Sequence, residues 1–383
     1  MTLPRIPFNR PALAGNELDN VRAVLESRHL SGDGPFTKRC HALLESMTGS
    51  AHALLTHSCT ASLEMAALLA DVGPGDEVIM PSFTFVSTAN AFALRGATPV
   101  FVDIRDDTLN LDESIVADAV TPRTRAIVPV HYAGVGCAMD ALQAIADRHG
   151  LMVIEDAAQG VGARWRGRPL GAIGDLGCLS FHETKNVVSG EGGALLVNRD
   201  DLLERAEIIR EKGTNRSRFF RGQVDKYTWV DVGSSYLPSD ILAGVLLAQL
   251  ESADALHDAR MALWARYHEA FESLERDGFV QRPFVPAECD HNAHMYYLRL
   301  PSLDARTALI SSLVEQNIHP VFHYIPLHSS PAGRRFARAH GDELPVTDRV
   351  SECLVRLPIW PGLGADIERV IAAVLEHAHT ETR

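Results

Sequence analysis

A single lysine stands where the chain could carry out covalent chemistry on a carbonyl group. Lys185 follows an apolar run that ends at Ser180, and it precedes a glycine-rich bend over 190–193. Because it lies between two strand-like segments and not on a charged helix face, we expect the protein to surround it. A partly desolvated lysine can lose its proton near neutral pH and attack a carbonyl. We hypothesise that Lys185 forms a Schiff base with pyridoxal phosphate (PLP), the alternative being a surface lysine in a loop.

An aspartate one strand upstream supplies a second part that PLP requires. Asp156 ends an apolar run that begins at Leu151, and it is followed by Ala-Ala-Gln, the glutamine being Gln159. A carboxylate placed there is costly to bury without a positively charged partner. A protonated pyridine nitrogen would be such a partner, and PLP needs that proton to act as an electron sink. Capping of a following helix is the alternative role for Asp156.

A turn of small and hydroxyl-bearing residues over 56–62 precedes an apolar helix predicted over 63–70. At such a helix N-terminus, unpaired backbone N–H groups and the helix dipole favour an anion. The turn therefore predicts a phosphate site. Plain capping of the helix by Ser or Thr is the alternative.

A long polar segment over 213–235 is a candidate for substrate binding. Loops of this length inside a compact domain tend to be functional. Its basic and aromatic residues are Arg216, Arg218, Arg221, Lys226, Phe219, Phe220, Tyr227 and Trp229. This mixture suits a phosphorylated ligand that carries a base, with Arg221 and Lys226 as contacts, although a solvated or subunit-interface loop explains it equally well. His323 and Tyr324, at a predicted strand end, are further candidates, with structural packing as the alternative for the histidine.

Strands that read as continuous apolar runs alternate with helices through the first part of the chain. We predict strands over 51–55, 77–81, 99–104, 126–131 and 151–156, and helices over 17–30, 36–47, 63–70, 84–94, 139–149 and 200–212. This alternation indicates βα units with a mainly parallel sheet that is covered on both faces. Ligands of such sheets bind beyond the carboxyl ends of the strands.

The second part of the chain predicts a smaller α/β domain. A long helix or helix pair over 240–271 is expected to link it to the first, and further elements are predicted over 295–300, 305–316, 319–324 and 366–377. We expect a large PLP-binding domain over 1–245 and a small domain over 246–383. The length of 383 residues suits two domains of the usual roughly 100–200 residues each.

Composition excludes several classes of protein. The formal net charge of −13 argues against a nucleic-acid surface, where clustered basic charge supplies most of the affinity. No apolar run approaches the roughly 18 to 20 residues that span a bilayer, and the N-terminus does not resemble a signal peptide. The six cysteines are scattered without spacings that suit zinc. We expect a cytoplasmic protein with no metal site and no membrane or nucleic-acid partner.

Taken together, these motifs resemble the PLP-dependent nucleotide-sugar aminotransferases of the DegT/DnrJ/EryC1/StrS family over nearly the whole chain. The matching stretches are 58–63, 74–78, 81–85, 155–159, 180–186 and 190–193. Within the family, 6–9, 181–185, 211–216 and 322–328 look most like the branch of dTDP-4-amino-4,6-dideoxygalactose transaminases. The resemblance implies an aspartate-aminotransferase-like fold (fold type I), a homodimer with shared active sites, and L-glutamate as amino donor.

The resemblance also implies a role for each matching residue. Lys185 would be the Schiff-base lysine and proton carrier, and Asp156 would keep the pyridine nitrogen protonated. The remaining cofactor contacts would be Gln159 to the ring oxygen, Phe85 stacked on the ring, and Thr60, Ala61 (through its backbone) and Ser180 to the phosphate. Many relatives carry Gly-x-Asn-x-Arg where 233–237 reads Gly-Ser-Ser-Tyr-Leu. The Asn that reaches the partner's phosphate is therefore missing, and Ser235 or backbone of the same loop would replace it.

The expected reaction moves the amino group of glutamate to C4 of a dTDP-4-keto-6-deoxyhexose (dTDP-4-dehydro-6-deoxy-D-glucose) and leaves 2-oxoglutarate. Amination at C3, or of another keto sugar nucleotide such as a 4-keto pentose, is the alternative within the same class. A PLP-binding regulatory protein without turnover is the alternative outside it, and the set of Asp156, Gln159 and Lys185 argues against that function. A Rossmann dehydrogenase is excluded because no Gly-x-Gly-x-x-Gly opens a first βα unit.

Overall fold

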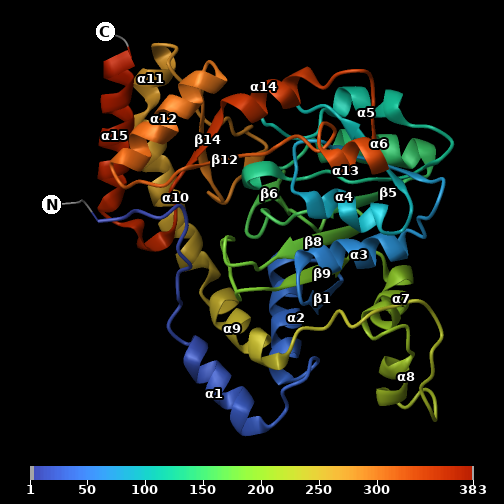
Figure 1. Ribbon diagram of the computed structural model, residues 1–383. Helices are drawn as coiled ribbons and strands as arrows, with labels where there is room; N and C mark the ends of the chain where they lie inside the picture. Colours follow the sequence, from blue (N-terminus) through green and yellow to red (C-terminus); the bar gives the residue numbers. More distant parts are fainter. Residues whose placement is uncertain (1–3, 382–383) are drawn as a thin grey trace.

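The computed structural model describes residues 4–381, and the largest element within them is an eight-stranded sheet (Figure 1). Its strand order is β1-β9-β8-β5-β4-β2-β3-β13. The strands are β1 His52–Thr56, β2 Glu77–Pro81, β3 Thr98–Val102, β4 Thr124–Ile127, β5 Met152–Asp156, β8 Leu176–Ser180, β9 Gly193–Val197 and β13 Arg338–Ala339. From β8 to β13 all neighbours pair in parallel, while β9 pairs antiparallel with both β8 and β1. The predicted mainly parallel sheet is confirmed.

Burial on both faces explains why the strands read as continuous apolar runs. Along β2, Ile79 belongs to the core on one side of the sheet, and Val78 and Met80 belong to the core on the other. The first side is covered by α2 Pro35–Thr48, α5 Glu113–Ala119, α6 Met139–His149 and α9 Asp240–Glu251. The second side is covered by α3 Cys59–Leu69, α4 Val86–Ala93 and α7 Asp200–Arg210. The sheet thus forms the middle of three layers.

A second, three-stranded sheet is built by the C-terminal part of the chain, in the order β11-β14-β12. Its strands are β11 Tyr296–Arg299, β12 Val321–Phe322 and β14 Leu354–Leu357, and its helices are α10 Ala253–Ala270, α11 Glu272–Arg276, α12 Leu303–Glu315 and α15 Asp366–Glu381. We call these elements the small lobe (Figure 1, upper left). Along β14, Val355 and Leu357 pack into the helical core of this lobe, whereas Leu354 joins a cluster with Phe83 and Tyr132. One face of the small sheet is therefore turned toward the large one.

The remaining elements are short or peripheral. They are α1 Glu17–Ser27, α8 Arg216–Phe220, α13 Pro331–Phe336, α14 Pro345–Cys353, the 3-10 turns Tyr132–Gly134 and Pro361–Leu363, and a small sheet of β10 Cys289–Asp290, β6 Arg164–Trp165 and β7 Arg168–Pro169. The stretch over 213–235, which we predicted to be irregular, contains α8. The helix or helix pair predicted over 240–271 is a pair. No helix within residues 4–381 is long and apolar enough to cross a membrane.

The carboxyl ends of β1, β5 and β8 meet at one edge of the large sheet. Asp156 lies opposite Cys178 of β8, while Thr56 and Ser180 both lie opposite Gly193 of β9. Gly193 is required here because a Cβ atom on it would approach the backbone N of Cys59 to 2.5 Å. The turn that begins α3 can therefore lie against β9, next to the loop that follows β8. Segments far apart in the sequence thus meet beyond this edge.

A buried carboxylate fastens the last strand, β13, to the sheet. Glu77 is 2% exposed and accepts hydrogen bonds from Arg338 Nε at 3.0 Å and Nη2 at 2.9 Å, and from Arg123 and Thr121. These hydrogen bonds, those of Arg338 above all, lower the pKa of Glu77 from 4.5 to about 2. A carboxyl group with a lowered folded-state pKa stabilises the fold above its unfolded pKa and loses that contribution as the pH falls toward 2.

Glu77→Gln is therefore expected to lower the free energy of unfolding at pH 7 by about 2 kcal/mol, the usual value for hydrogen bonds to a charged group. The difference from wild type should shrink as the pH falls from 5 to 3. Urea denaturation at pH 7, 5 and 3 measures the difference in the free energy of unfolding. The exposed Glu343→Gln is the control, and it should leave the free energy of unfolding unchanged at each pH. Equal stabilities of Glu77→Gln and wild type at pH 7 would show that the cluster contributes nothing.

Candidate active site

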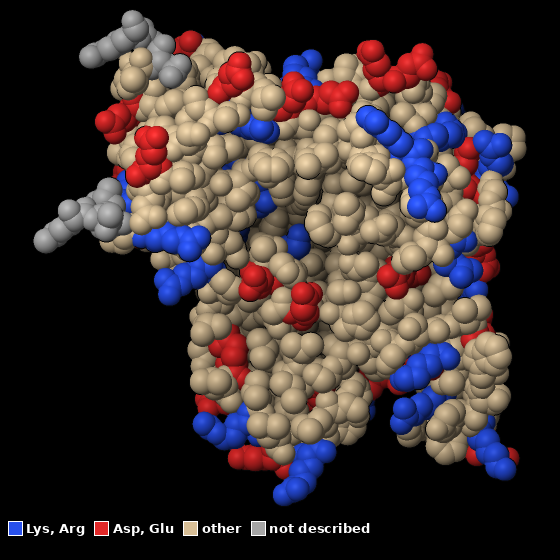
Figure 2. All heavy atoms as spheres, in the orientation of Figure 1, with Lys and Arg blue, Asp and Glu red and all other residues tan. Residues whose placement is uncertain are grey.

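A cavity of about 500 Å³ lies beyond the carboxyl edge of the large sheet, where the sheet faces the small lobe. The face drawn in Figure 2 is hollowed between these two parts, and Lys or Arg atoms lie inside the hollow. Eight of the residues predicted from sequence line this cavity: Thr60, Phe85, Asp156, Gln159, Ser180, Lys185, His323 and Tyr324. The structure thus brings together residues from both parts of the chain.

Lys185 lies in the loop between β8 and β9, and its backbone N–H donates to His182 O at 2.9 Å. Its side chain borders the cavity and makes no hydrogen bond or ion pair with any residue in 4–381. Burial lowers the pKa of Lys185, and the nearby Arg356 lowers it further, against the opposing effects of Cys59 and Asp156. A lysine in these surroundings has its neutral, nucleophilic form made more accessible.

Hydrogen bonds from the segment 292–294 hold Asn186, the residue that follows Lys185, in place. Asn186 donates to Asn292 O at 2.8 Å, and its Oδ1 lies 3.0 Å from His294 Nδ1. Asn292 in turn donates to Gln159 O at 2.8 Å. Burial lowers the pKa of His294 well below its ordinary value, so the imidazole is neutral. The loops that carry Lys185 and Gln159 are therefore held in a fixed relation.

Asp156 lies at the end of β5 and is 5% exposed. It accepts hydrogen bonds from Thr88 Oγ1 at 2.7 Å and from the backbone N–H of Ala158 at 3.2 Å. Thr84 lies 2.8 Å from Thr88 and donates to it, because the Thr88 proton is directed to the carboxylate. Asp156 forms no ion pair within the described part of the chain. A buried carboxylate with no cation of its own fits a protonated pyridine nitrogen.

The N-terminus of α3 meets that of α4 at the same cavity. Ser58 caps α3 by accepting from Ala61 N–H at 3.1 Å, and Thr60 Oγ1 lies 2.8 Å from Ser87 Oγ. The first N–H groups of a helix have no acceptor within it and attract anions. Ser180 borders this place from the end of β8. Ala61 is buried beneath it, and a phosphate at its N–H would compete with the Ser58 cap.

Polar and ring contacts connect Gln159 with Tyr324 and His323 in the cavity. Gln159 accepts from Ala133 N–H at 2.7 Å and donates to Tyr324 OH at 3.3 Å. The Tyr324 ring is stacked on His323 with 3.7 Å between the ring centroids. Burial raises the pKa of Tyr324 to about 12 and lowers that of His323 well below its ordinary value. Both groups are therefore neutral at pH 7.

Three residues predicted to contact substrate or the partner's cofactor lie away from this cavity. Ser235 and Arg221 line a separate cavity of about 750 Å³ beside α2, α7 and α8. Arg221 pairs with Glu207, with 2.9 Å between Nη1 and Oε2. Lys226 is exposed and lines neither cavity. Within one chain, these residues do not reach Lys185.

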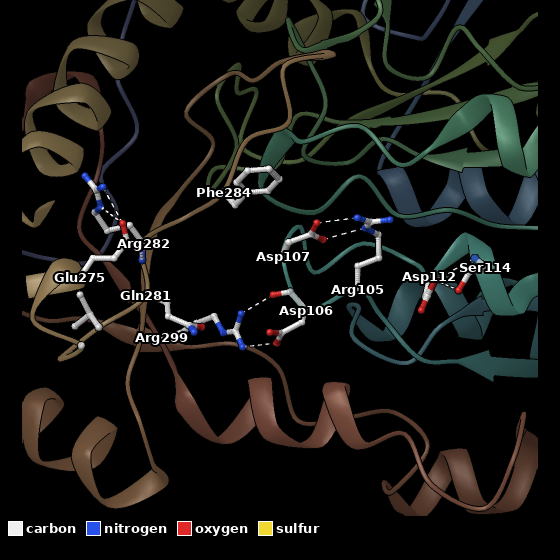
Figure 3. Close-up of a pocket in the computed structure, with 12 residues that line it drawn as sticks. Arg105, Asp106, Asp107, Asp112, Ser114, Glu275, Gln281, Arg282, Phe284 and Arg299 are labelled. Atoms are coloured by element: carbon white, nitrogen blue, oxygen red, sulfur yellow. Dashed lines mark hydrogen bonds and ion pairs between the residues drawn. The ribbon is translucent and has the colours of Figure 1, made fainter.

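Another cavity, of about 910 Å³, is an open groove with no lysine in its lining (Figure 3). Each arginine that lines it forms an ion pair with a carboxylate. The nitrogen–oxygen distances are 2.7 Å for Arg105 and Asp107, 2.8 Å for Arg282 and Glu275, and 2.5 Å for Arg299 and Asp106. Among residues 4–381, no group of three or more His, Cys, Asp or Glu side chains could hold a metal ion. This groove therefore offers no lysine for Schiff-base chemistry.

Three residues of the site were not singled out from the sequence. Thr88 holds Asp156, His294 holds the loop of Lys185, and Arg356 donates to His323 at 2.6 Å. One signal was available for Arg356, since it is a charged residue inside the apolar run 353–357. Thr88 and His294 offered none, because their partners are distant in sequence.

Comparison with known proteins gives one consistent result. Residues 11–375 match the DegT/DnrJ/EryC1/StrS aminotransferase family. The spore coat polysaccharide biosynthesis protein SpsC of Bacillus subtilis is 35% identical over 377 residues, which are 96% of each chain. DesV of S. venezuelae has a similar structure, with a TM-score of 0.88, 33% identity, and coverage of 98% of this chain and 99% of that one. The PLP form of the putative sugar aminotransferase Spr1654 from Streptococcus pneumoniae gives a TM-score of 0.89 at 25% identity, covering 98% of this chain and 99% of that one.

The residues of the cavity fit this family's cofactor. Lys185 would meet the aldehyde of PLP, and the buried carboxylate of Asp156 would meet the pyridine nitrogen. The N-termini of α3 and α4 would meet the phosphate. The chain therefore belongs to the DegT/DnrJ/EryC1/StrS aminotransferase family and is a PLP-dependent transaminase of fold type I.

Proposed function

We propose that this enzyme transfers the amino group of L-glutamate to C4 of a dTDP-4-keto-6-deoxyhexose, dTDP-4-dehydro-6-deoxy-D-glucose. The products would be a dTDP-4-amino-4,6-dideoxy sugar and 2-oxoglutarate. The observation that carries this proposal is Lys185, half-buried near Asp156 in a cavity that the small lobe helps to form. The comparisons support a sugar substrate, since SpsC is named for polysaccharide biosynthesis and Spr1654 is called a putative sugar aminotransferase.

The chain's own residues can carry out the proton transfers that such a reaction needs. PLP, when bound, supplies an electron sink that stabilises negative charge on the reacting carbon. Lys185 Nζ would take the proton from Cα of glutamate and, in the second half of the cycle, return one to C4 of the sugar. Asp156, oriented by Thr88, would keep the pyridine nitrogen protonated. Phe85, 60% exposed at the cavity, offers a flat surface for the ring.

Preference for the 4-keto dTDP sugar rests on the stretches that resemble the 4-aminotransferase branch. Three of them contribute to the cavity: 6–9 through Phe8, 181–185 through Lys185 and its neighbours, and 322–328 through His323 and Tyr324. The fourth, 211–216, borders the separate cavity that contains Ser235. These positions support our proposal that residues typical of the branch recognise the substrate.

We also propose a cytoplasmic homodimer in which 213–235 faces the partner's active site. Phe220, Tyr227 and Trp229 of this segment are 69%, 52% and 76% exposed. Exposed aromatic side chains in one segment favour a protein interface. Arg221, Lys226 and Ser235 would then act on the partner's substrate and cofactor. In each protomer, 1–245 would form the PLP-binding domain and 246–383 the small domain.

A panel of keto sugar nucleotides tests the proposal. With glutamate as donor, kcat/KM should be highest for dTDP-4-keto-6-deoxyglucose, compared with a dTDP-3-keto sugar, a UDP-4-keto pentose and a UDP-4-keto hexose. A clear preference for the 3-keto sugar or for the pentose would establish the alternative within the same class. PLP that binds but is not converted by glutamate would contradict turnover altogether.

A further inference from the structure

A histidine in the cavity of Lys185 has one ring nitrogen without a partner. His294 lies two residues before β11, lines this cavity and is 4% exposed. Its Nδ1 lies 3.0 Å from Asn186 Oδ1. Its Nε2 forms no hydrogen bond with any residue in 4–381, yet it is not one of the fully buried side-chain atoms that lack a partner in that part of the chain. Nε2 therefore opens into the cavity.

The hydrogen bonds of Asn186 decide which nitrogen of this histidine carries the proton. A backbone carbonyl can only accept, so the amide nitrogen of Asn186 donates to Asn292 O at 2.8 Å. The amide oxygen of Asn186 is thereby turned to His294, and Nδ1 must be the donor. Burial holds the pKa of His294 well below its ordinary value, so the ring has a single proton, on Nδ1. Nε2 presents a lone pair and can only accept a hydrogen bond.

The two other histidines that line the cavity have a polar partner at each ring nitrogen. His182 Nδ1 accepts from Thr184 N–H at 3.3 Å, and its Nε2 lies 3.9 Å from Glu191 Oε1. In His323, Nε2 accepts from an arginine at 2.6 Å, and Nδ1 lies 3.1 Å from a tyrosine hydroxyl. An acceptor in a largely buried side chain is unfavourable without a donor. The free nitrogen of His294 is therefore suited to a ligand that donates.

The chemistry of the two substrates decides which of them meets this acceptor. At neutral pH the carboxylates of glutamate carry lone pairs and no proton, so Nε2 would repel them. The amino group of glutamate is the group that reacts, and it is directed to the cofactor. A sugar ring carries hydroxyl groups, each of which can donate. An acceptor at this place therefore favours the sugar over the amino donor.

The position of Lys185 indicates which hydroxyl group this is. Lys185 would return a proton to C4, so C4 must come close to Nζ. Burial and, after it, the charge of Lys185 lower the pKa of His294, so the two side chains lie near each other. Of the two carbons bonded to C4 in a 6-deoxyhexose, C3 carries a hydroxyl group, whereas C5 carries only a methyl group and the ring oxygen. We propose that His294 Nε2 accepts a hydrogen bond from the C3 hydroxyl group of the keto sugar, an inference that rests on the proposed function.

This assignment makes His294 a specificity residue for the second half of the cycle. Loss of the acceptor should weaken recognition of the sugar and leave the reaction with glutamate nearly unchanged. A hydrogen bond from Lys185 Nζ to the same nitrogen would instead affect both halves, and its effect would not depend on the C3 hydroxyl group.

The first test measures binding of dTDP-6-deoxy-D-glucose, which has no keto group and cannot react, to the PLP-loaded enzyme by calorimetry. The 3-deoxy form of this probe should bind wild type about tenfold more weakly, because one buried acceptor is left unpaired. His294→Asn keeps a donor at the place of Nδ1 but lacks the acceptor, so it should bind both probes about equally. His294→Gln, whose amide oxygen reaches the place of Nε2, should recover part of the difference. His149→Asn, at an exposed position of α6, should keep all of it.

The second test follows the two half-reactions separately by cofactor absorbance. In His294→Asn, the keto sugar concentration for half-maximal rate should rise by about tenfold, while the rate with glutamate should stay within about threefold. Equal binding of the two probes by wild type, or an undiminished difference in His294→Asn, would overturn the assignment while leaving the transaminase intact. A hydroxyl preference that depends on His294 in an enzyme that never converts glutamate would instead overturn the proposed function alone.

Discussion

Replacing Lys185 with alanine is expected to abolish amino transfer, with a loss of at least about 10⁴-fold. Positioned proton transfer alone accounts for about 10² to 10⁴ in rate, and this substitution also removes the nucleophile that holds the cofactor aldehyde. The variant should retain its far-UV circular dichroism but lose the absorbance of lysine-bound PLP. Steady-state assays with glutamate and the keto sugar measure the rate.

A second variant separates charge from covalent chemistry. Lys185→Arg keeps a positive charge in the cavity but cannot form the Schiff base, so it should be as inactive as Lys185→Ala. Activity of either variant within tenfold of wild type would end the assignment of Lys185. An inactive but folded protein that still shows the lysine-bound absorbance would point to another lysine.

Replacing Asp156 with asparagine is expected to slow both half-reactions by about 10² to 10³, the effect of removing one preorganised charge from an active site. The amide is nearly isosteric and can still accept from Thr88, but it cannot hold a proton on the pyridine nitrogen. PLP content should remain close to that of wild type. Stopped-flow absorbance after mixing with glutamate gives the rate of the first half-reaction directly.

Thr88→Val provides the matched, milder change. It preserves the shape of the side chain and removes the 2.7 Å hydrogen bond to Asp156, while the carboxylate stays in place. The expected loss is about tenfold, in line with one hydrogen bond to a charged group. A defect as large as that of Asp156→Asn, or a normal rate in Asp156→Asn, would mean that the carboxylate does not control the pyridine nitrogen.

Much of the large sheet could be predicted because its strands are buried on both faces. Continuous apolar runs mark β2 and β5, and polar residues directly after the strands mark the carboxyl edge. The placement of Asp156, Ser180 and Lys185 around one cavity follows from that topology. The antiparallel direction of β9 and the two-residue strand β13 did not follow, because neither direction nor so short a pairing leaves a periodic signal.

The parts of the site that could not be predicted depend on tertiary packing. Arg356 enters the cavity because β14 turns alternate residues toward the large sheet, and this requires knowing how the two sheets face each other. His294 acts through Asn186, more than a hundred positions earlier in the chain. Arg221, Lys226 and Ser235 lie away from the cavity within one chain, so their proposed roles depend on a second protomer.

The transfer of nitrogen itself tests the proposed function most directly. The enzyme would be incubated with PLP, ¹⁵N-labelled L-glutamate and dTDP-4-keto-6-deoxyglucose, and the purified product examined by ¹H–¹⁵N and ¹³C NMR. We expect the label on C4 of a dTDP-4-amino-4,6-dideoxy sugar, with one 2-oxoglutarate formed per aminosugar. Label at C3, or recovery of the keto sugar without label while glutamate is consumed, would contradict it.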